Sequence, residues 1–180
     1  QEAGMDTVKL EGGRARLPAV REIVSAGIPV MGHLGLTPQS INQLGGFRPQ
    51  ARQAEAAKTL LEDAELLQEA GCFSIVLESV PARLAELISK RLEIPTIGIG
   101  AGPGCDGQVL VTHDLLGLFE RFTPKFVKKY ANLHQEMAQA FADYKSDVER
   151  HSFPAPEHCV EMPDEEWENL LQLIQSGKQS

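Results

Sequence analysis

Apolar positions in the first hundred residues follow two alternating patterns. Short apolar, β-prone runs are each followed by a longer stretch in which apolar residues recur every three or four positions. The runs predict strands, which lie at Val8–Glu11, Val30–Leu34, Ser74–Glu78 and Thr96–Gly100. The stretches predict helices between the strands, with Gly27 and Gly71 as the expected stops of the first two. Strands that alternate with helices are typical of an α/β protein with a parallel sheet.

The pattern changes after Gly100. Gln108–Val111 has the composition of a strand, but only about seven residues separate it from Gly100, and a parallel crossover usually needs a dozen or more. We therefore predict a helix over Gln108–Leu116 and a fifth strand at Lys125–Tyr130. A long helix is expected over 133–149, and its buried stripe would be formed by Met137, Phe141, Tyr144 and Val148.

The composition changes again beyond His151, where prolines and acidic residues precede a short amphipathic segment. Pro163 is expected to open a helix there, with acidic residues in its first turn. This change predicts two parts, residues 1–150 and a peripheral acidic tail of residues 151–180. We expect the apolar side chains of the tail helix to dock on a neighbouring surface, and these are Trp167, Leu170, Leu171 and Ile174.

Composition narrows the functional class. The formal net charge of −8 argues against nucleic acid as a partner. No apolar run is long enough to span a bilayer, and the first residues lack the pattern of a signal peptide. The three cysteines show no C-x-x-C spacing, so we expect free thiols. These observations predict a soluble cytoplasmic protein.

Ionisable side chains mark the ends of three predicted strands. Lys9 and Glu11 are two residues apart and therefore share one face of a strand, His33 follows Gly32, and Glu78 ends a strongly apolar run. At strand ends such residues can build an active site, and a partly desolvated carboxylate such as Glu78 can act as a general base. Other roles remain open, because Lys9 and Glu11 could form a salt bridge, His33 could be a satisfied core histidine or a metal ligand, and Glu78 could serve in an ion pair or cap a helix.

Gly102–Gly107 formally matches the G-x-G-x-x-G dinucleotide fingerprint. The match is weak, because no helix is expected to begin inside the glycines and Pro103 stiffens the loop. We interpret the segment as a loop after a strand that could contact an anionic substrate.

Five segments taken together resemble the ketopantoate hydroxymethyltransferase family, in the order found in that family and as far as about Pro154. The segment around His33 is the most specific of them. The five are Val8–Gly13, Gly32–Ser40, Leu77–Pro81, Ile97–Gly102 and Asp106–Val111.

The resemblance implies a (β/α)8 TIM barrel of the phosphoenolpyruvate/pyruvate-like superfamily and a large homo-oligomer, a decamer. It implies transfer of a hydroxymethyl group from 5,10-methylenetetrahydrofolate to 3-methyl-2-oxobutanoate, giving 2-dehydropantoate in pantothenate synthesis. By motif, Glu78 matches the catalytic base, Lys9 the contact to the substrate carboxylate, Glu11 a Mg²⁺ ligand and His33 a pocket residue.

The chain also departs from the family pattern. Two aspartates that contact metal or substrate, one of them in a Gly-Asp-Ser sequence, belong to the family's second and third strands, whereas Val8–Glu11 matches the fourth. The expectation is an incomplete barrel that lacks the first three strands and needs a further N-terminal segment. Two alternatives follow, an inactive fragment and a related lyase or mutase that acts on another Mg²⁺-bound enolate.

Overall fold

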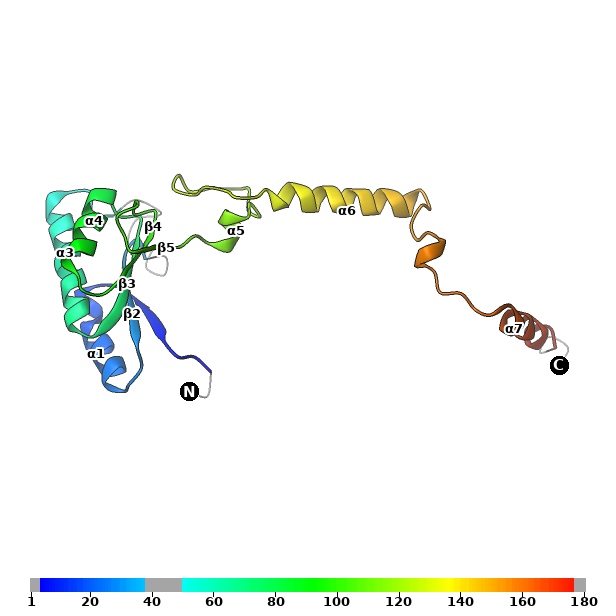
Figure 1. Ribbon diagram of the computed structural model, residues 1–180, viewed down its shortest axis with the longest axis horizontal. Helices are drawn as coiled ribbons and strands as arrows, with labels where there is room; N and C mark the ends of the chain where they lie inside the picture. The colour runs from blue at the N-terminus through cyan, green and yellow to red at the C-terminus, as the bar shows by residue number, and fades with distance from the viewer. Residues whose placement is uncertain (1–3, 38–49, 177–180) are drawn as a thin grey trace. The chain divides into compact units, whose positions relative to one another are not determined.

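The computed structural model describes residues 4–37 and 50–176, and the chain divides into two compact units, residues 1–131 and 132–180. The first unit is an α/β fold built on a five-stranded parallel sheet (Figure 1). The strands lie in sequence order in the sheet, and they are β1 (Val8–Glu11), β2 (Val30–Gly35), β3 (Cys72–Glu78), β4 (Thr96–Ile99) and β5 (Gly107–Gln108). The predicted α/β class and the first four strands are confirmed.

Three helices cover one face of this sheet (Figure 1). They are α1 (Leu17–Ser25), which follows the short turn η1 (Arg14–Arg16), α3 (Ala54–Glu69) and α4 (Ala82–Arg91). Gly27 and Gly71 follow the first two helices with φ of +80° and +97°, a conformation that favours glycine and ends a helix. The glycine stops expected from the sequence are therefore confirmed.

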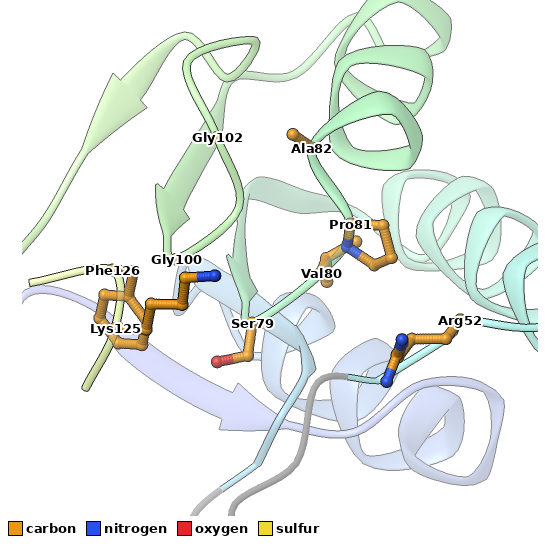
Figure 2. A pocket seen from close by; sticks show the side chains of 9 residues that line it. All are labelled: Arg52, Ser79, Val80, Pro81, Ala82, Gly100, Gly102, Lys125 and Phe126. Atoms are coloured by element: carbon orange, nitrogen blue, oxygen red, sulfur yellow. The ribbon is translucent and has the colours of Figure 1, made fainter.

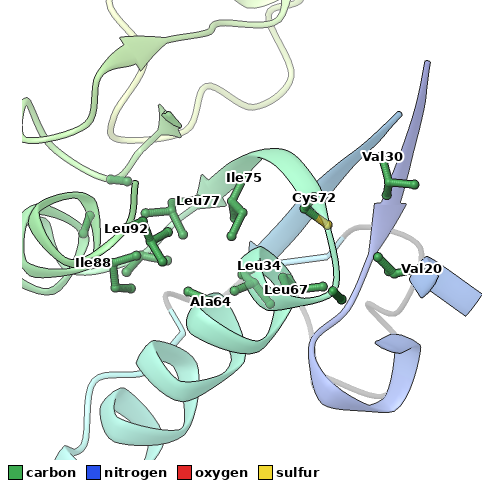
Figure 3. Close-up of a cluster of buried hydrophobic side chains, with 14 residues drawn as sticks. Val20, Val30, Leu34, Ala64, Leu67, Cys72, Ile75, Leu77, Ile88 and Leu92 are labelled. Atoms are coloured by element: carbon green, nitrogen blue, oxygen red, sulfur yellow. The ribbon is translucent and has the colours of Figure 1, made fainter. Parts of the chain in front are cut away.

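The hydrophobic core lies between the sheet and these helices (Figure 3). Leu67 of α3 and Ile88 of α4 are fully buried against Ile75 and Leu77 of β3. Truncation of one such side chain to alanine costs about 2–5 kcal/mol, so this packing fixes the position of β3 and of the residues at its end.

The fifth strand is not where the sequence predicted it. Lys125–Tyr130 forms turns and irregular backbone, and the fifth strand is β5, with Gly107 in register with Ile97 of β4. The predicted helix over 108–116 is reduced to α5 (Thr112–Leu115). The crossover-length argument failed because both strands are very short. The loop of residues 100–106 only has to run back along the four-residue strand β4 before β5 begins. At about 3.3 Å per residue, the loop is longer than that strand.

The second unit contains α6 (Leu133–Glu149), the short turn η3 (Pro156–His158) and α7 (Asp164–Ser176). The bounds of α6 agree with the prediction, and α7 begins directly after Pro163, whose carbonyl accepts a hydrogen bond from the Trp167 N–H. The predicted burial of the α6 stripe is wrong in this chain, where Phe141 is 67% exposed. Helical periodicity identifies an apolar face, but it does not show which surface, if any, covers that face within the chain.

The composition-based division at residue 150 stays a prediction, although α6 lies in the second compact unit. None of the described helices is both long enough and apolar enough to cross a membrane.

The three cysteines are free and differ in environment, since Cys72 is buried in the core and Cys159 is exposed. Burial raises the pKa of the Cys72 thiol to about 11, so it stays protonated and unreactive near neutral pH. We expect a brief maleimide pulse on the folded chain to label Cys159 and spare Cys72, as read by peptide mass spectrometry. Guanidinium should abolish the difference. Equal labelling in native buffer would contradict the burial of Cys72.

Candidate active site at the carboxyl ends of the strands

The strand register brings three of the predicted site residues together. Glu11 of β1 is in register with His33 of β2, and Gly35 of β2 is in register with Glu78 of β3. Because alternate residues of a strand share a face, Glu11, His33 and Glu78 lie on the same face of the sheet, opposite the helices. Lys9 lies two residues before Glu11 on that face and is exposed.

His33 lies between the two carboxylates. Its Nδ1 is 3.4 Å from Oε1 of Glu11, and its Nε2 is 3.2 Å from Oε2 of Glu78. The imidazole is buried, while the carboxylates keep 12% and 16% of their side-chain surface exposed. The histidine therefore links two acids that remain accessible from outside.

Neither ring nitrogen of His33 makes a hydrogen bond of good geometry within the described residues, despite the nearby carboxylates. Buried polar atoms are nearly always satisfied, and an unsatisfied pair calls for an explanation. The interpretation of His33 as a satisfied core histidine therefore does not fit this structure. A bound ligand that draws the carboxylates into better alignment would satisfy the ring.

Backbone hydrogen bonds fix the position of Glu78. Its carbonyl accepts a hydrogen bond of 2.8 Å from the N–H of Leu36, and the next N–H, that of Ser79, donates to Ile99 at 2.9 Å. Gly35, with φ of +91°, passes so close to the Glu78 carbonyl that a Cβ there would collide with it. The approach of these two strand ends thus depends on a residue without a side chain.

The Gly102–Gly107 loop is tied to the sheet. The Asp106 carboxylate accepts hydrogen bonds from the Thr96 N–H at 2.8 Å and from the Thr96 hydroxyl at 2.9 Å, and these hold the pKa of Asp106 below its usual value. The loop leads into the two-residue strand β5 and not into a helix. The dinucleotide interpretation is therefore excluded in favour of a structural loop.

A cavity of about 590 Å³ opens next to this cluster, at the ends of β3 and β4 (Figure 2). Ser79, directly after Glu78, lines it, and so does Phe126, whose ring packs against Gly100. Arg52 and Lys125 also line it and contribute positive charge. Sequence reasoning missed this cavity, because it predicted a strand at Lys125 and did not single out Arg52. The remainder of the motif around His33, Pro38–Ser40, lies outside the described residues.

Comparison with known proteins identifies the family of the chain. A profile of the ketopantoate hydroxymethyltransferase family matches residues 1–156. The chain belongs to this family. Among its relatives, proteins named 3-methyl-2-oxobutanoate hydroxymethyltransferase are 61% identical over 88% of the chain in Moorella thermoacetica and 57% identical over 96% in Syntrophobacter fumaroxidans. The relative in Nitratidesulfovibrio vulgaris is 58% identical over 97% of the chain.

The chain spans only part of these ketopantoate hydroxymethyltransferase relatives. It covers 59% of the Moorella protein, 61% of the Syntrophobacter protein and 57% of the Nitratidesulfovibrio protein. A C-terminal portion of a family member fits this coverage.

The donor set at the cluster bears on the Mg²⁺ that the family resemblance implies. Within residues 4–37 and 50–176, no group of three or more His, Cys, Asp or Glu side chains is arranged to hold a metal ion. Mg²⁺ is commonly held by only one or two protein carboxylates, with substrate and water completing its octahedron. The partly exposed Glu11 carboxylate fits that role as a single ligand.

Proposed function

We propose that the chain forms the C-terminal part of a ketopantoate hydroxymethyltransferase with an incomplete (β/α)8 barrel. The reaction moves a one-carbon unit from 5,10-methylenetetrahydrofolate to 3-methyl-2-oxobutanoate, giving 2-dehydropantoate. The observation that carries this proposal is the placement of Glu11, His33 and Glu78 on one open face at the strand ends. In a parallel α/β fold that is where catalytic groups gather.

Glu78 is the proposed base. It would take the proton from C3 of the oxo acid, and the electron pair left on C3 would delocalise into the neighbouring keto group. C3 would then form a bond to the one-carbon carbon of the donor as the bond from that carbon to one donor nitrogen breaks, and water would displace the second nitrogen. The proton taken by Glu78 and one proton of the water would end on the two nitrogens. One water is consumed overall, and its oxygen becomes the new hydroxyl group. Mg²⁺ held with the help of Glu11 would supply Lewis-acid chemistry at the oxo-acid oxygens.

His33 is proposed to position the two acids. An imidazolium carries two N–H donors and can serve both Glu11 and Glu78, whereas a neutral imidazole can donate to only one of them. One carboxylate oxygen lies near each ring nitrogen, 3.4 Å from Nδ1 and 3.2 Å from Nε2. His33 would thereby hold the proposed base and the proposed metal ligand close to each other.

The test requires an assembled enzyme, in which residues 1–180 are joined to the part of the Moorella thermoacetica relative that the chain does not match. Product analysis with 3-methyl-2-oxobutanoate and methylenetetrahydrofolate should show 2-dehydropantoate. A different product from the oxo acid would favour a lyase or mutase of the same superfamily.

An inactive fragment is the second candidate, favoured because the given sequence contains no Gly-Asp-Ser, the sequence that carries one of the two aspartates of the family pattern. Calorimetric titration of the soluble fraction of the 180-residue chain with Mg²⁺ and with the oxo acid separates the two. Heat of binding from either ligand would support a site that binds ligands of the proposed reaction. If neither ligand gives heat, the inactive fragment is supported.

Lys9→Ala in the assembled enzyme is expected to raise KM for the oxo acid by about tenfold or more, with a smaller effect on kcat. The reason is loss of a charge-assisted hydrogen bond to the substrate carboxylate. Steady-state kinetics at saturating folate measures this. Lys58→Ala, on the exposed surface of α3, is the matched control. A fall in kcat without a change in KM would give Lys9 a transition-state role instead.

The second unit is proposed to serve assembly. The apolar side chains of α6 and α7 are exposed in the single chain, among them Phe141 at 67% and Trp167 at 53%. Exposed apolar faces of this kind are typical of interfaces between subunits. A homo-oligomer, as the family resemblance implies, would bury them.

A further inference from the structure

The cavity beside Glu78 combines positive charge with apolar walls. Arg52 and Lys125 line it from different segments of the chain, and Figure 2 shows them on opposite sides of Ser79. Neither takes part in an ion pair among the described residues, whereas Arg14, Lys90 and Arg91 each contact a carboxylate. In a chain with a net charge of −8, two such cations at one cavity favour an anionic ligand.

The walls favour a ligand with a planar, apolar body. Val80 and Pro81 form one side, and the Phe126 ring lies against Gly100, where a Cβ would collide with it. At about 590 Å³, the cavity falls within the range of about 300–1,000 Å³ that small-molecule sites occupy. A five-carbon oxo acid with a single carboxylate would leave most of this volume empty.

The backbone around the cavity is strained in two places. Ser79 has φ of +52° and lines the cavity, and Ala51, which precedes Arg52, has φ of +53°. Residues other than glycine adopt this conformation at a cost, and such positions cluster at ligand sites. One of the two strained residues therefore lines the cavity, and the other directly precedes a lining residue.

We infer that this cavity binds the glutamate-bearing end of the one-carbon donor, with Arg52 and Lys125 facing its carboxylates and Phe126 facing its benzoyl ring. The inference rests on the proposed function, since it assigns the second substrate of that reaction. Ser79 directly follows Glu78, so a donor held here would present its one-carbon unit beside the proposed base.

The test compares two ligands that differ only in the glutamate. Tetrahydrofolate and tetrahydropteroate share the pteridine and benzoyl groups, and only the first carries the glutamate carboxylates. Calorimetry on the assembled enzyme is expected to show about tenfold tighter binding of tetrahydrofolate than of tetrahydropteroate. Arg52→Gln and Lys125→Gln should each remove most of this preference and leave the affinity for tetrahydropteroate within about twofold.

Matched variants separate a specific contact from bulk charge. Lys128→Gln removes a cation of the same segment that lies 4.9 Å from the Tyr130 ring, outside the cavity lining, and should keep the full preference. Lys125→Arg preserves the charge and should keep most of it. Equal affinity for the two ligands would overturn the inference, and so would a preference that survives in both glutamine variants or is lost equally in Lys128→Gln.

Kinetics of the assembled enzyme provide the second measurement. Arg52→Gln and Lys125→Gln should raise KM for methylenetetrahydrofolate about tenfold and leave KM for the oxo acid within about twofold. A rise in the oxo-acid KM alone would overturn the assignment. An inactive assembled enzyme that still prefers tetrahydrofolate would contradict the proposed reaction and support the glutamate site. An active assembled enzyme whose kinetics neither variant changes would support the proposed reaction and contradict the glutamate site.

Discussion

Glu78→Gln in the assembled enzyme is expected to lower proton exchange at C3 of 3-methyl-2-oxobutanoate by about a thousandfold or more. The substitution removes the group that would accept the proton and keeps its shape, and a positioned base contributes about 10²–10⁴-fold. The fold around it should persist, because the backbone there is held by the hydrogen bond from the Leu36 N–H to the carbonyl of residue 78 and by that from the Ser79 N–H to the Ile99 carbonyl, and not by the carboxylate.

Deuterium wash-in at C3, followed by NMR in the absence of folate, measures this step apart from the transfer. Binding of the oxo acid by calorimetry should change only a few-fold. Glu86→Gln is the control, since that exposed carboxylate pairs with Lys90 on α4. Exchange at the unaltered rate in Glu78→Gln would assign the base elsewhere, with Glu11 as the next carboxylate within reach of His33.

Local sequence patterns were sufficient for the first part of the fold. The strands from β1 to β4 and the helices between them follow from apolar periodicity, and their ends follow from glycines with positive φ. Both patterns can be recognised from residues that are close together in the sequence. No local pattern predicts the position of β5, because a two-residue strand is defined by its pairing with β4 and not by its own composition.

The acid cluster was predictable for a related reason. Parallel strands end at the same edge, so ionisable residues that close successive strands meet there, as Glu11, His33 and Glu78 do. The unsatisfied nitrogens of His33 depend on side-chain geometry that no pattern encodes.

The cavity was not predictable, because Arg52 and Lys125 are far apart in the sequence and come to line the same cavity only in the folded structure. Lys125–Tyr130 looks like a strand in isolation. In the structure Phe126 instead packs on Gly100, and the Tyr130 N–H donates to Leu115. Tertiary contacts therefore override the local preference of this segment.

Co-expression with a segment that carries the family's first three strands is expected to restore both solubility and Mg²⁺-dependent transferase activity to the chain. Strands β1 and β5 are the two ends of the described sheet, so each has a paired neighbour on one side only. Open strand edges present N–H and C=O groups that pair with other chains and promote aggregation. The face with Glu11, His33 and Glu78 would in addition have no opposite barrel wall.

The 180-residue chain alone is therefore expected to be poorly stable or aggregated, and sedimentation velocity with thermal melts measures this. The added segment should pair with the edge of β1 around Val8–Glu11 and supply the two aspartates that the family pattern requires. A segment with both aspartates changed to alanine is the matched control, and it should restore solubility without activity. A monodisperse, cooperatively melting and active chain without any added segment would contradict the incomplete barrel, because neither the sheet edge nor the metal site would then need a complement.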